Sequence, residues 1–246
     1  MRITNSKPCR FATDCRAIAA TAIILTFFVS GQMAQATDGD LDPTFGTAGL
    51  PTLDTAGQVM TDFDHSTDIA NAVAVQADGK LVLVGTTYIN NDYTDEDFAV
   101  ARYNAHGTLD TTFGTGGKVR TDFPGLAAVA SSVVIQPDGK IVVAGGAFPL
   151  FTFLGDFKLV RYNPDGSLDT SFGNDGIVTT SFPGQGSYAF AVALQPDGKI
   201  VAAGTDFVAF SPSEDSSNTD FGLHALQPGW NARYHIRERR PGCNRF

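Results

Sequence analysis

A repeat of about 60 residues constrains the fold of this chain more than any other feature of its sequence. The phrase Q-P-D-G-K at residues 136–140 recurs at 195–199 and, as Q-A-D-G-K, at 76–80; its glycines are 60 and then 59 residues apart. A second phrase, D-F-x-x-x-R-Y-N, begins at Asp97 and Asp156, and a third, L-D-x-x-F-G, begins at Leu41, Leu109 and Leu168. A fixed order of phrases at a fixed period predicts stacked structural units.

Each phrase predicts strands or the turns between them. In Q-P-D-G-K the proline presets φ and the glycine takes the left-handed conformation that closes a bulged hairpin. The flanking runs at residues 132–135 and 141–144 are apolar on both faces, which predicts strands buried on both sides. Further strands are expected over D-F-K-L-V-R-Y at 156–162 and L-D-T-S-F at 168–172. The glycines expected to close turns are Gly79, Gly107, Gly139, Gly166 and Gly198.

About four strands per unit, repeated and stacked face to face, describe an all-β fold of β-propeller-type blades. A two-sheet sandwich is the alternative, but a sandwich would not repeat its sequence so closely. Residues 37–223 hold about three repeats and a lead-in. Closed propellers have typically about four to eight blades, so we expect an incomplete ring. Its open strand edges would favour aggregation or require a partner.

The order Q-P-D-G-K, D-F-x-L-x-R-Y-N and L-D-x-x-F-G resembles the delta-60 repeat family of exported bacterial proteins over essentially all of residues 39–223. The resemblance implies a propeller-like repeat in a secreted or surface protein, with no catalytic residues to carry over. Two connections, at residues 88–96 and 207–219, are longer or more polar than the repeat requires.

Residues 1–36 are typical of a secretory signal peptide. Four basic residues and one acidic residue accompany an uncharged run at 17–31, and Ala34-Gln35-Ala36 follows. Small residues at these positions predict cleavage between Ala36 and Thr37, and therefore a secreted, periplasmic or surface protein. The uncharged run is short for a membrane span of about 20 residues, although an uncleaved anchor is the alternative. Cleavage would remove Cys9 and Cys15, so the body of the chain would contain no cysteine.

Residues 224–246 break the repeat. After Asp220-Phe221-Gly222-Leu223 the pattern predicts one variable residue and then R-Y-N-P-D-G, but the chain continues H-A-L-Q-P-G-W-N-A-R-Y. The codons allowed for this segment permit R-Y-N-P-D-G-T-L-D-T-T-F-G in the adjacent frame. We therefore expect a tail translated out of frame from a fourth repeat, and a truncated chain. A genuine basic tail is the alternative.

The overall net charge of -9 is the sum of three segments whose charges differ in sign and size. Residues 1–36 carry +3, residues 37–223 carry -16 and residues 224–246 carry +4. A body this acidic excludes a nucleic-acid-binding protein that tracks phosphates with a basic face. Acidity also helps an exported protein to remain soluble.

Few residues in the body of the chain, residues 37–223, suggest a catalytic or metal-binding role. His65 and His106 are its only histidines, and His106 occupies a turn position where the next repeat has Asp165 within Pro-Asp-Gly. No Ser-His-Asp set, zinc-ligand pairs or phosphate loop is present in the sequence pattern. Two acidic groups could offer oxygen ligands to calcium, although their spacing fits no EF-hand and surface residues are the simpler interpretation. These groups are Asp38, Asp40 and Asp42, and Asp92, Asp95, Glu96 and Asp97.

The sequence therefore predicts a non-catalytic interaction or structural module that needs no cofactor, with loops as the binding surface for a protein or glycan ligand. No stable membrane span is expected after signal cleavage. The alternative is a fragment of a propeller hydrolase or lyase, or a calcium-binding exported protein. An enzyme of that kind would place one equivalent carboxylate or histidine from each blade at a central channel, whereas the recurring acids here lie in turns.

Overall fold

The computed structural model describes residues 40–46, 57–63, 65–89, 92–150, 155–181, 186–207 and 219–226. The chain separates into two units, Met1–Asp38 and Gly39–Phe246, and every described residue belongs to the second unit. The predicted signal peptide, its cleavage site at Ala36 and Thr37, and the tail after Leu226 lie outside the described residues.

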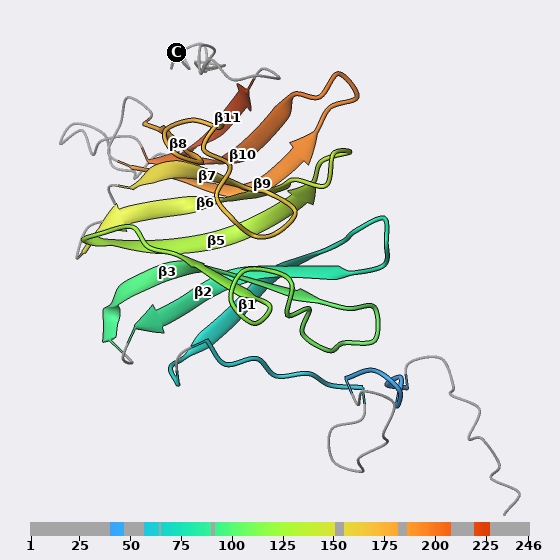
Figure 1. Cartoon of the computed structure of the whole chain (residues 1–246). Coiled ribbons are helices and arrows are strands. Elements are labelled where there is room, and N and C mark those ends of the chain that lie inside the picture. Colours follow the sequence, from blue (N-terminus) through green and yellow to red (C-terminus); the bar gives the residue numbers. More distant parts are fainter. Residues whose placement is uncertain are drawn as a thin grey trace, which may run out of the picture. The chain divides into compact units, whose positions relative to one another are not determined.

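The described residues form three antiparallel sheets in which each strand pairs with the next strand along the chain (Figure 1). The first sheet comprises β1 (Asp68–Val75), β2 (Leu81–Ile89), β3 (Asp92–Tyr103) and β4 (Lys118–Thr121). The second comprises β5 (Leu126–Ile135), β6 (Ile141–Pro149), β7 (Asp156–Tyr162) and β8 (Ile177–Thr180). The third comprises β9 (Ser187–Leu194), β10 (Ile200–Phe207) and β11 (Thr219–Leu226). The prediction of an all-β fold built from incomplete propeller blades is confirmed.

Each blade begins with a tight hairpin whose turn is the Q-x-D-G-K phrase. Gly139 has φ +83°, donates its N–H to Gln136 O at 2.9 Å, and follows Asp138, whose Oδ1 accepts the Lys140 N–H at 3.2 Å. Gly79 and Gly198 have nearly the same φ, +83° and +84°. This conformation favours glycine, because a Cβ atom would be strained there.

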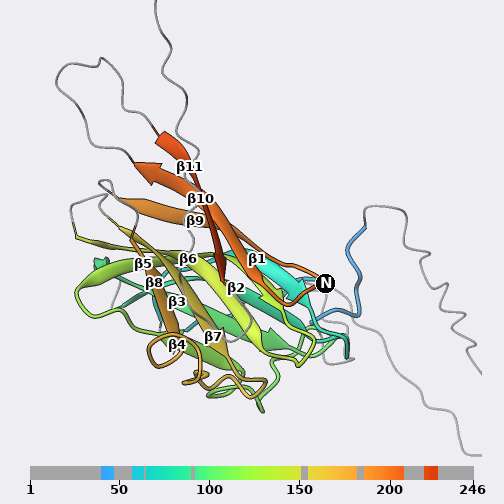
Figure 2. The same ribbon diagram turned by 90° about the horizontal axis from the view of Figure 1, so that it is seen from above.

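The sheets pack face to face and overlap when seen from above (Figure 2). The middle sheet contributes side chains to both cores. Along β6, Val143 joins Val84 and Phe98 in the core shared with the first sheet. The neighbouring Val142 faces the opposite way and joins Ala202 in the core shared with the third sheet. Successive side chains of a strand point to opposite faces, which explains why this run is apolar throughout.

Two expectations about the blades were wrong in detail. The phrase L-D-T-S-F does not form the fourth strand; it is a turn in which Phe172 N–H bonds Asp169 O at 2.9 Å, and the fourth strand is Ile177–Thr180. The segment 88–96 is not simply a loop, because Tyr88 pairs with Glu96 and Ile89 with Asp92 across a bulge. Backbone pairing thus extends the β2–β3 hairpin beyond the repeat. The other long connection, at 208–218, lies outside the described residues.

Within the part of the chain that the structure describes, no helix has the length and apolar character needed to cross a membrane.

Candidate functional site

A cluster of three charged residues recurs in the first two blades. In the second blade, Asp169 Oδ2 lies 2.7 Å from Arg161 Nε and 3.0 Å from Lys140 Nζ. The L-D-x-x-F-G turn aims the carboxylate inward, where its other oxygen accepts the Ser171 N–H and hydroxyl at 3.1 and 2.6 Å. The lysine comes from the β5–β6 turn and the arginine from β7, so the cluster joins three parts of one blade.

The first blade repeats this geometry with nearly the same distances. Asp110 Oδ2 lies 2.8 Å from Arg102 Nε and 2.9 Å from Lys80 Nζ. Burial acts to raise the pKa of Asp110, but hydrogen bonds from Thr112 and Lys80 and the charge of Arg102 outweigh it and hold this pKa well below its ordinary value. The Arg102 guanidinium also lies 4.6 Å from the ring centroid of Phe113.

The sequence interpretation treated Asp138 and Asp169 alike as turn or loop residues. That interpretation describes Asp138, which is exposed in its hairpin turn. It is incomplete for Asp169, which is buried and holds two cations. The sequence does contain a signal for the cluster, because a lysine, an arginine and an aspartate recur at equivalent positions of the first two repeats.

The blades meet at a seam made by the turns of these same phrases. Gly114 N–H donates to Asp165 O of the next blade at 2.8 Å, and a Cβ atom on Gly166 would lie 2.9 Å from Gly114 N. The Arg102 guanidinium donates to Pro164 O across the same seam. Glycine is therefore required at position 166 by close backbone approach as well as by its φ of +91°.

The two histidines of the body occupy turn positions. His106 is exposed and its carbonyl accepts the Gly46 N–H at 2.7 Å, which is the role that Asp165 has in the next blade. Its neighbour Gly107 has φ +83°. His65 has φ +56° and its Nδ1 lies 2.8 Å from Asp62 Oδ2 at the surface. Among the described residues, neither histidine belongs to a group of three side chains that could hold a metal ion.

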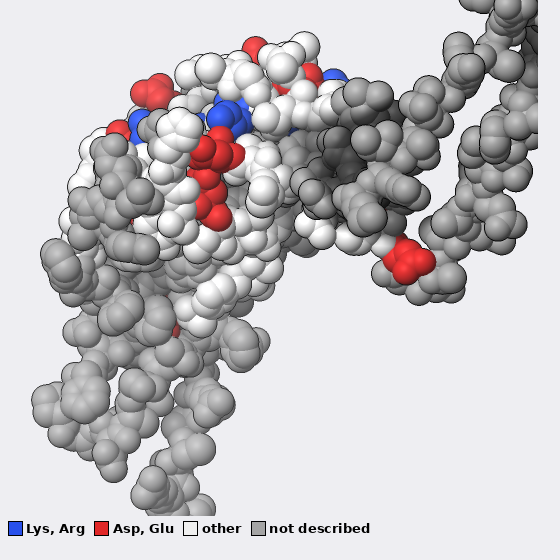
Figure 3. All heavy atoms as spheres, turned by 90° about the horizontal axis from the view of Figure 1, so that it is seen from below, with Lys and Arg blue, Asp and Glu red and all other residues white. Residues whose placement is uncertain are grey.

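The structure describes only part of the two acidic groups that could bind calcium. Asp97 is buried and lies 3.5 Å from Arg120 Nη1, and burial raises the pKa of Glu96. Among the described residues, no three His, Cys, Asp or Glu side chains are grouped so as to hold a metal ion. On the face shown in Figure 3, acidic side chains gather in separate small groups, several of them beside Lys or Arg. Asp38 and the side chains of Asp92 and Asp95 lie outside the described residues.

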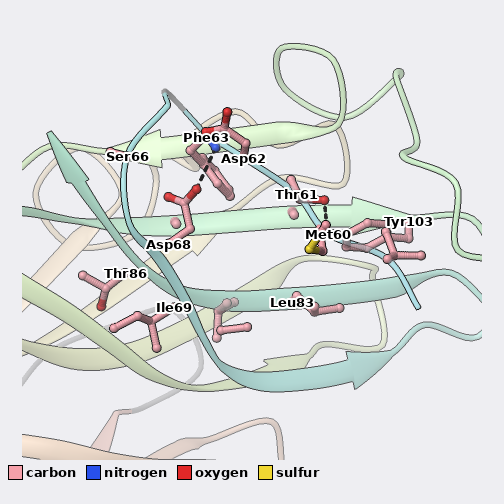
Figure 4. Close-up of a pocket in the computed structure, with 16 residues that line it drawn as sticks. Met60, Thr61, Asp62, Phe63, Ser66, Asp68, Ile69, Leu83, Thr86 and Tyr103 are labelled. Atoms are coloured by element: carbon pink, nitrogen blue, oxygen red, sulfur yellow. Dashed lines mark hydrogen bonds between the residues drawn. The ribbon is translucent and has the colours of Figure 1, made fainter. Parts of the chain in front are cut away.

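An apolar groove of about 520 Å³ lies on the face of the first sheet that the second sheet does not cover (Figure 4). Residues 59–63 cross this face and are held there by hydrogen bonds that include Phe63 N–H to Asp68 Oδ2 at 2.9 Å and Thr61 to the Tyr103 hydroxyl at 2.5 Å. The floor includes Ile69 and Leu83. A lining of this kind suits an apolar protein surface better than a small polar substrate.

Stacked antiparallel blades with a repeated seam define a β-propeller repeat protein. Three segments of the chain, residues 76–113, 136–172 and 195–217, match the family described as a domain of unknown function (DUF5122) beta-propeller. The first two matched segments each contain a complete Lys–Arg–Asp cluster, and the third contains Lys199 alone of the corresponding residues. The resemblance to the delta-60 repeat family is thus confirmed at the level of a propeller repeat. No curated protein matches the chain.

Proposed function

We propose that this chain is an exported β-propeller repeat protein that acts as a non-catalytic interaction or structural module. One observation supports this best: within each of the first two blades, the recurring lysine, arginine and aspartate bind one another. Asp169 with Arg161 and Lys140 is the clearest case. Perturbed carboxylates in a cleft would favour catalysis, whereas the same carboxylate repeated at equivalent turns favours a role in stability.

Export is supported by the charge and composition of residues 1–36. A basic start, an uncharged run and Ala34-Gln35-Ala36 are the three parts of a secretory signal. The test is to express the full chain in a bacterium and determine the N-terminus of the protein recovered outside the cytoplasm. Cleavage predicts a new N-terminus at Thr37, and Ala36→Arg is expected to abolish it. Recovery of the wild-type chain only in the cytoplasm, with Met1 retained, would contradict export.

The non-catalytic role is tested by assay of the purified chain against panels of ester, glycoside and polysaccharide substrates, with metal analysis of the same sample. Neither turnover nor bound metal is expected. If turnover is found, Asp110→Asn and Asp169→Asn distinguish the hypotheses. Loss of activity in proportion to unfolding indicates a structural cluster, whereas loss of activity in a fully folded variant would make these carboxylates catalytic and overturn the proposal.

The proposal also includes the origin of residues 224–246, which we interpret as an out-of-frame translation of a further repeat. The pairing of β10 with β11 places His224 where the second blade has Val160, and Ala225 where it has Arg161. His224 is only 2% exposed, so a polar residue occupies a core position of the repeat. The nucleotide sequence tests this directly, because codons that exclude R-Y-N-P-D-G in the adjacent frame would refute it.

A further inference from the structure

The first and second blades meet through a defined end of the first blade. This end consists of the L-D-x-x-F-G turn, the fourth strand and the T-D-F that follows it. Gly114 N–H bonds Asp165 O at 2.8 Å, and the hydroxyls of Thr121 and Tyr162 lie 2.6 Å apart in the buried seam. Within the turn itself, Gly117 N–H bonds Phe113 O at 2.9 Å.

The same end of a blade is present before the first sheet, and no strand precedes it among the described residues. We call residues 40–46 and 57–63 the N-terminal segment. Gly57 N–H bonds Phe45 O at 3.2 Å, as Gly117 bonds Phe113. The segment contacts the first blade through Gly46 N–H to His106 O at 2.7 Å and Thr61 to Tyr103 at 2.5 Å. The N-terminal segment is therefore the last quarter of a blade, already seated in its seam.

Among the described residues the third sheet has three strands, and the part that a fourth strand would add corresponds to the N-terminal segment. β3 pairs with β4 and β7 with β8, but in the described part of the chain β11 pairs only with β10. The row of backbone groups on the outer edge of β11 is the position that a fourth strand occupies in the other two blades. An open edge of this kind is a template for another strand.

The charges of the two incomplete parts are complementary. Asp42 corresponds to Asp110 and accepts the Thr44 N–H in the same way, at 2.8 Å, but no lysine or arginine among the described residues pairs with it. Lys199 corresponds to Lys80 and Lys140, each of which reaches the aspartate of its own blade. Lys199 instead pairs only with Asp197 of its own turn in the described structure.

The two outer faces expose side chains that are buried in the middle of the stack. Val73 on the first sheet is 60% exposed, whereas its equivalent in the second sheet, Val133, is 8% exposed. Leu223 on the third sheet is 37% exposed, whereas its equivalent Leu159 is fully buried. The first residue faces the side on which a preceding blade would pack, and the second faces the side of a following blade.

We propose that two copies of this chain close one six-bladed ring, in which the N-terminal segment of each copy provides the fourth strand of the third sheet of the other. The β3–β4 register, in which Val100 lies opposite Val119, places Leu223 opposite Val59 of the second copy. Asp42 then meets Lys199 of the second copy. The completed blade covers the groove beside residues 59–63. Val73 and Leu223 are then buried in the seams between the two copies.

A second copy fits these ends better than closure within one chain. Three blades are fewer than the roughly four to eight that form closed propellers, and six lie within that range. The N-terminal segment is already held against its own first sheet, so it cannot reach the far side of the third sheet of the same chain without leaving its seam. Two-fold symmetry brings the complementary ends together at two equivalent junctions and leaves no blade incomplete.

Sedimentation of the purified chain tests this arrangement with a reciprocal charge exchange. The wild-type chain is expected to have twice the mass of one chain. Asp42→Lys and Lys199→Asp each place like charges together at both junctions, and each is expected to weaken the dimer about tenfold or more. An equimolar mixture of the two variants restores both ion pairs, so it is expected to dimerise as a heterodimer.

Asp138→Lys is the matched control, because it makes the same charge change at an exposed turn of the middle blade, and its dimer is expected to remain intact. Circular dichroism establishes that each variant keeps its β structure, and if one single variant unfolds, the other carries the test. A folded wild-type monomer, open-ended higher oligomers, or single variants that dimerise like the wild type would each overturn the proposal.

Discussion

Arg161 and Asp169 lie eight positions apart in the sequence, yet their side chains meet at 2.7 Å beneath the turn that connects them. The Arg161 guanidinium lies 4.4 Å from the ring centroid of Phe172, so the same side chain pairs with a carboxylate and packs on an aromatic ring. Arg102, Asp110 and Phe113 repeat the arrangement one blade earlier. The cluster fixes the L-D-x-x-F-G turn to the third strand of its blade.

Asp169→Asn is expected to lower the free energy of unfolding by about 2 kcal/mol, because Arg161 and Lys140 would lose their shared counter-charge. Lys140 is partly exposed, which keeps the loss below that of a fully buried pair. Chemical denaturation followed by circular dichroism measures it. Asp138→Asn is the control and is expected to change stability by about 0.5 kcal/mol or less. Equal losses for the two variants would show that the cluster adds no stability.

Stability is expected to fall in acid because of Asp110 and Asp169. For Asp169, burial acts to raise the pKa, but hydrogen bonds from Ser171 and Lys140 and the charge of Arg161 hold it well below its ordinary value. A carboxyl with a lowered folded-state pKa contributes its full stability above its unfolded pKa, about 3.9, and loses it as the pH falls toward the folded value.

The free energy of unfolding is therefore expected to be steady near neutrality and to decline below about pH 5. Denaturation series across this range measure the slope. The double variant Asp110→Asn, Asp169→Asn should be less stable at neutral pH and should have a shallower acid slope. An unchanged slope would assign the acid sensitivity to other carboxylates.

Tyr162→Phe is expected to destabilise the chain by about 1 kcal/mol, because it removes the buried hydrogen bond to Thr121 across the first seam. Burial raises the pKa of Tyr162 well above its ordinary value, so the hydroxyl remains neutral throughout the neutral range. A double-mutant cycle with Thr121→Val measures the coupling, which should be about 1 kcal/mol. Strict additivity of the two changes would argue against this contact.

Gly145→Ala is expected to cost about 3 kcal/mol or more, because its Cβ atom would lie 2.0 Å from Val129 O and 2.8 Å from Phe98 Cζ. Neither the backbone of β5 nor the neighbouring blade can move aside without opening the core. Gly116→Ala is the matched control: its φ is +62° and its Cβ would meet open space, so only the conformational cost of about 1 kcal/mol is expected. Thermal unfolding of both variants separates the two causes, and a similar shift in both would refute the packing argument.

Local chemistry determined the period, the β character and the hairpin turns from the sequence alone. Proline and aspartate before Gly139, and strands apolar on both faces around it, specify a hairpin whatever surrounds it. The same reasoning is weakest where a short segment can form either a strand or a turn. L-D-T-S-F reads as a strand by composition, but Asp169 bonds the backbone and hydroxyl of Ser171 and makes it a turn.

Only the tertiary structure decided which distant residues meet. Lys140 and Asp169 are far apart along the chain, and nothing local requires their ion pair, which forms because the β5–β6 turn and the L-D-x-x-F-G turn lie at the same end of one blade. The seam contact between Thr121 and Tyr162 likewise depends on one sheet packing on the next. Turn conformation depends on residues that are adjacent in sequence, whereas packing determines which residues meet across a sheet or a seam. For that reason the sequence alone predicted the blades but not the charge clusters within them or the seams between them.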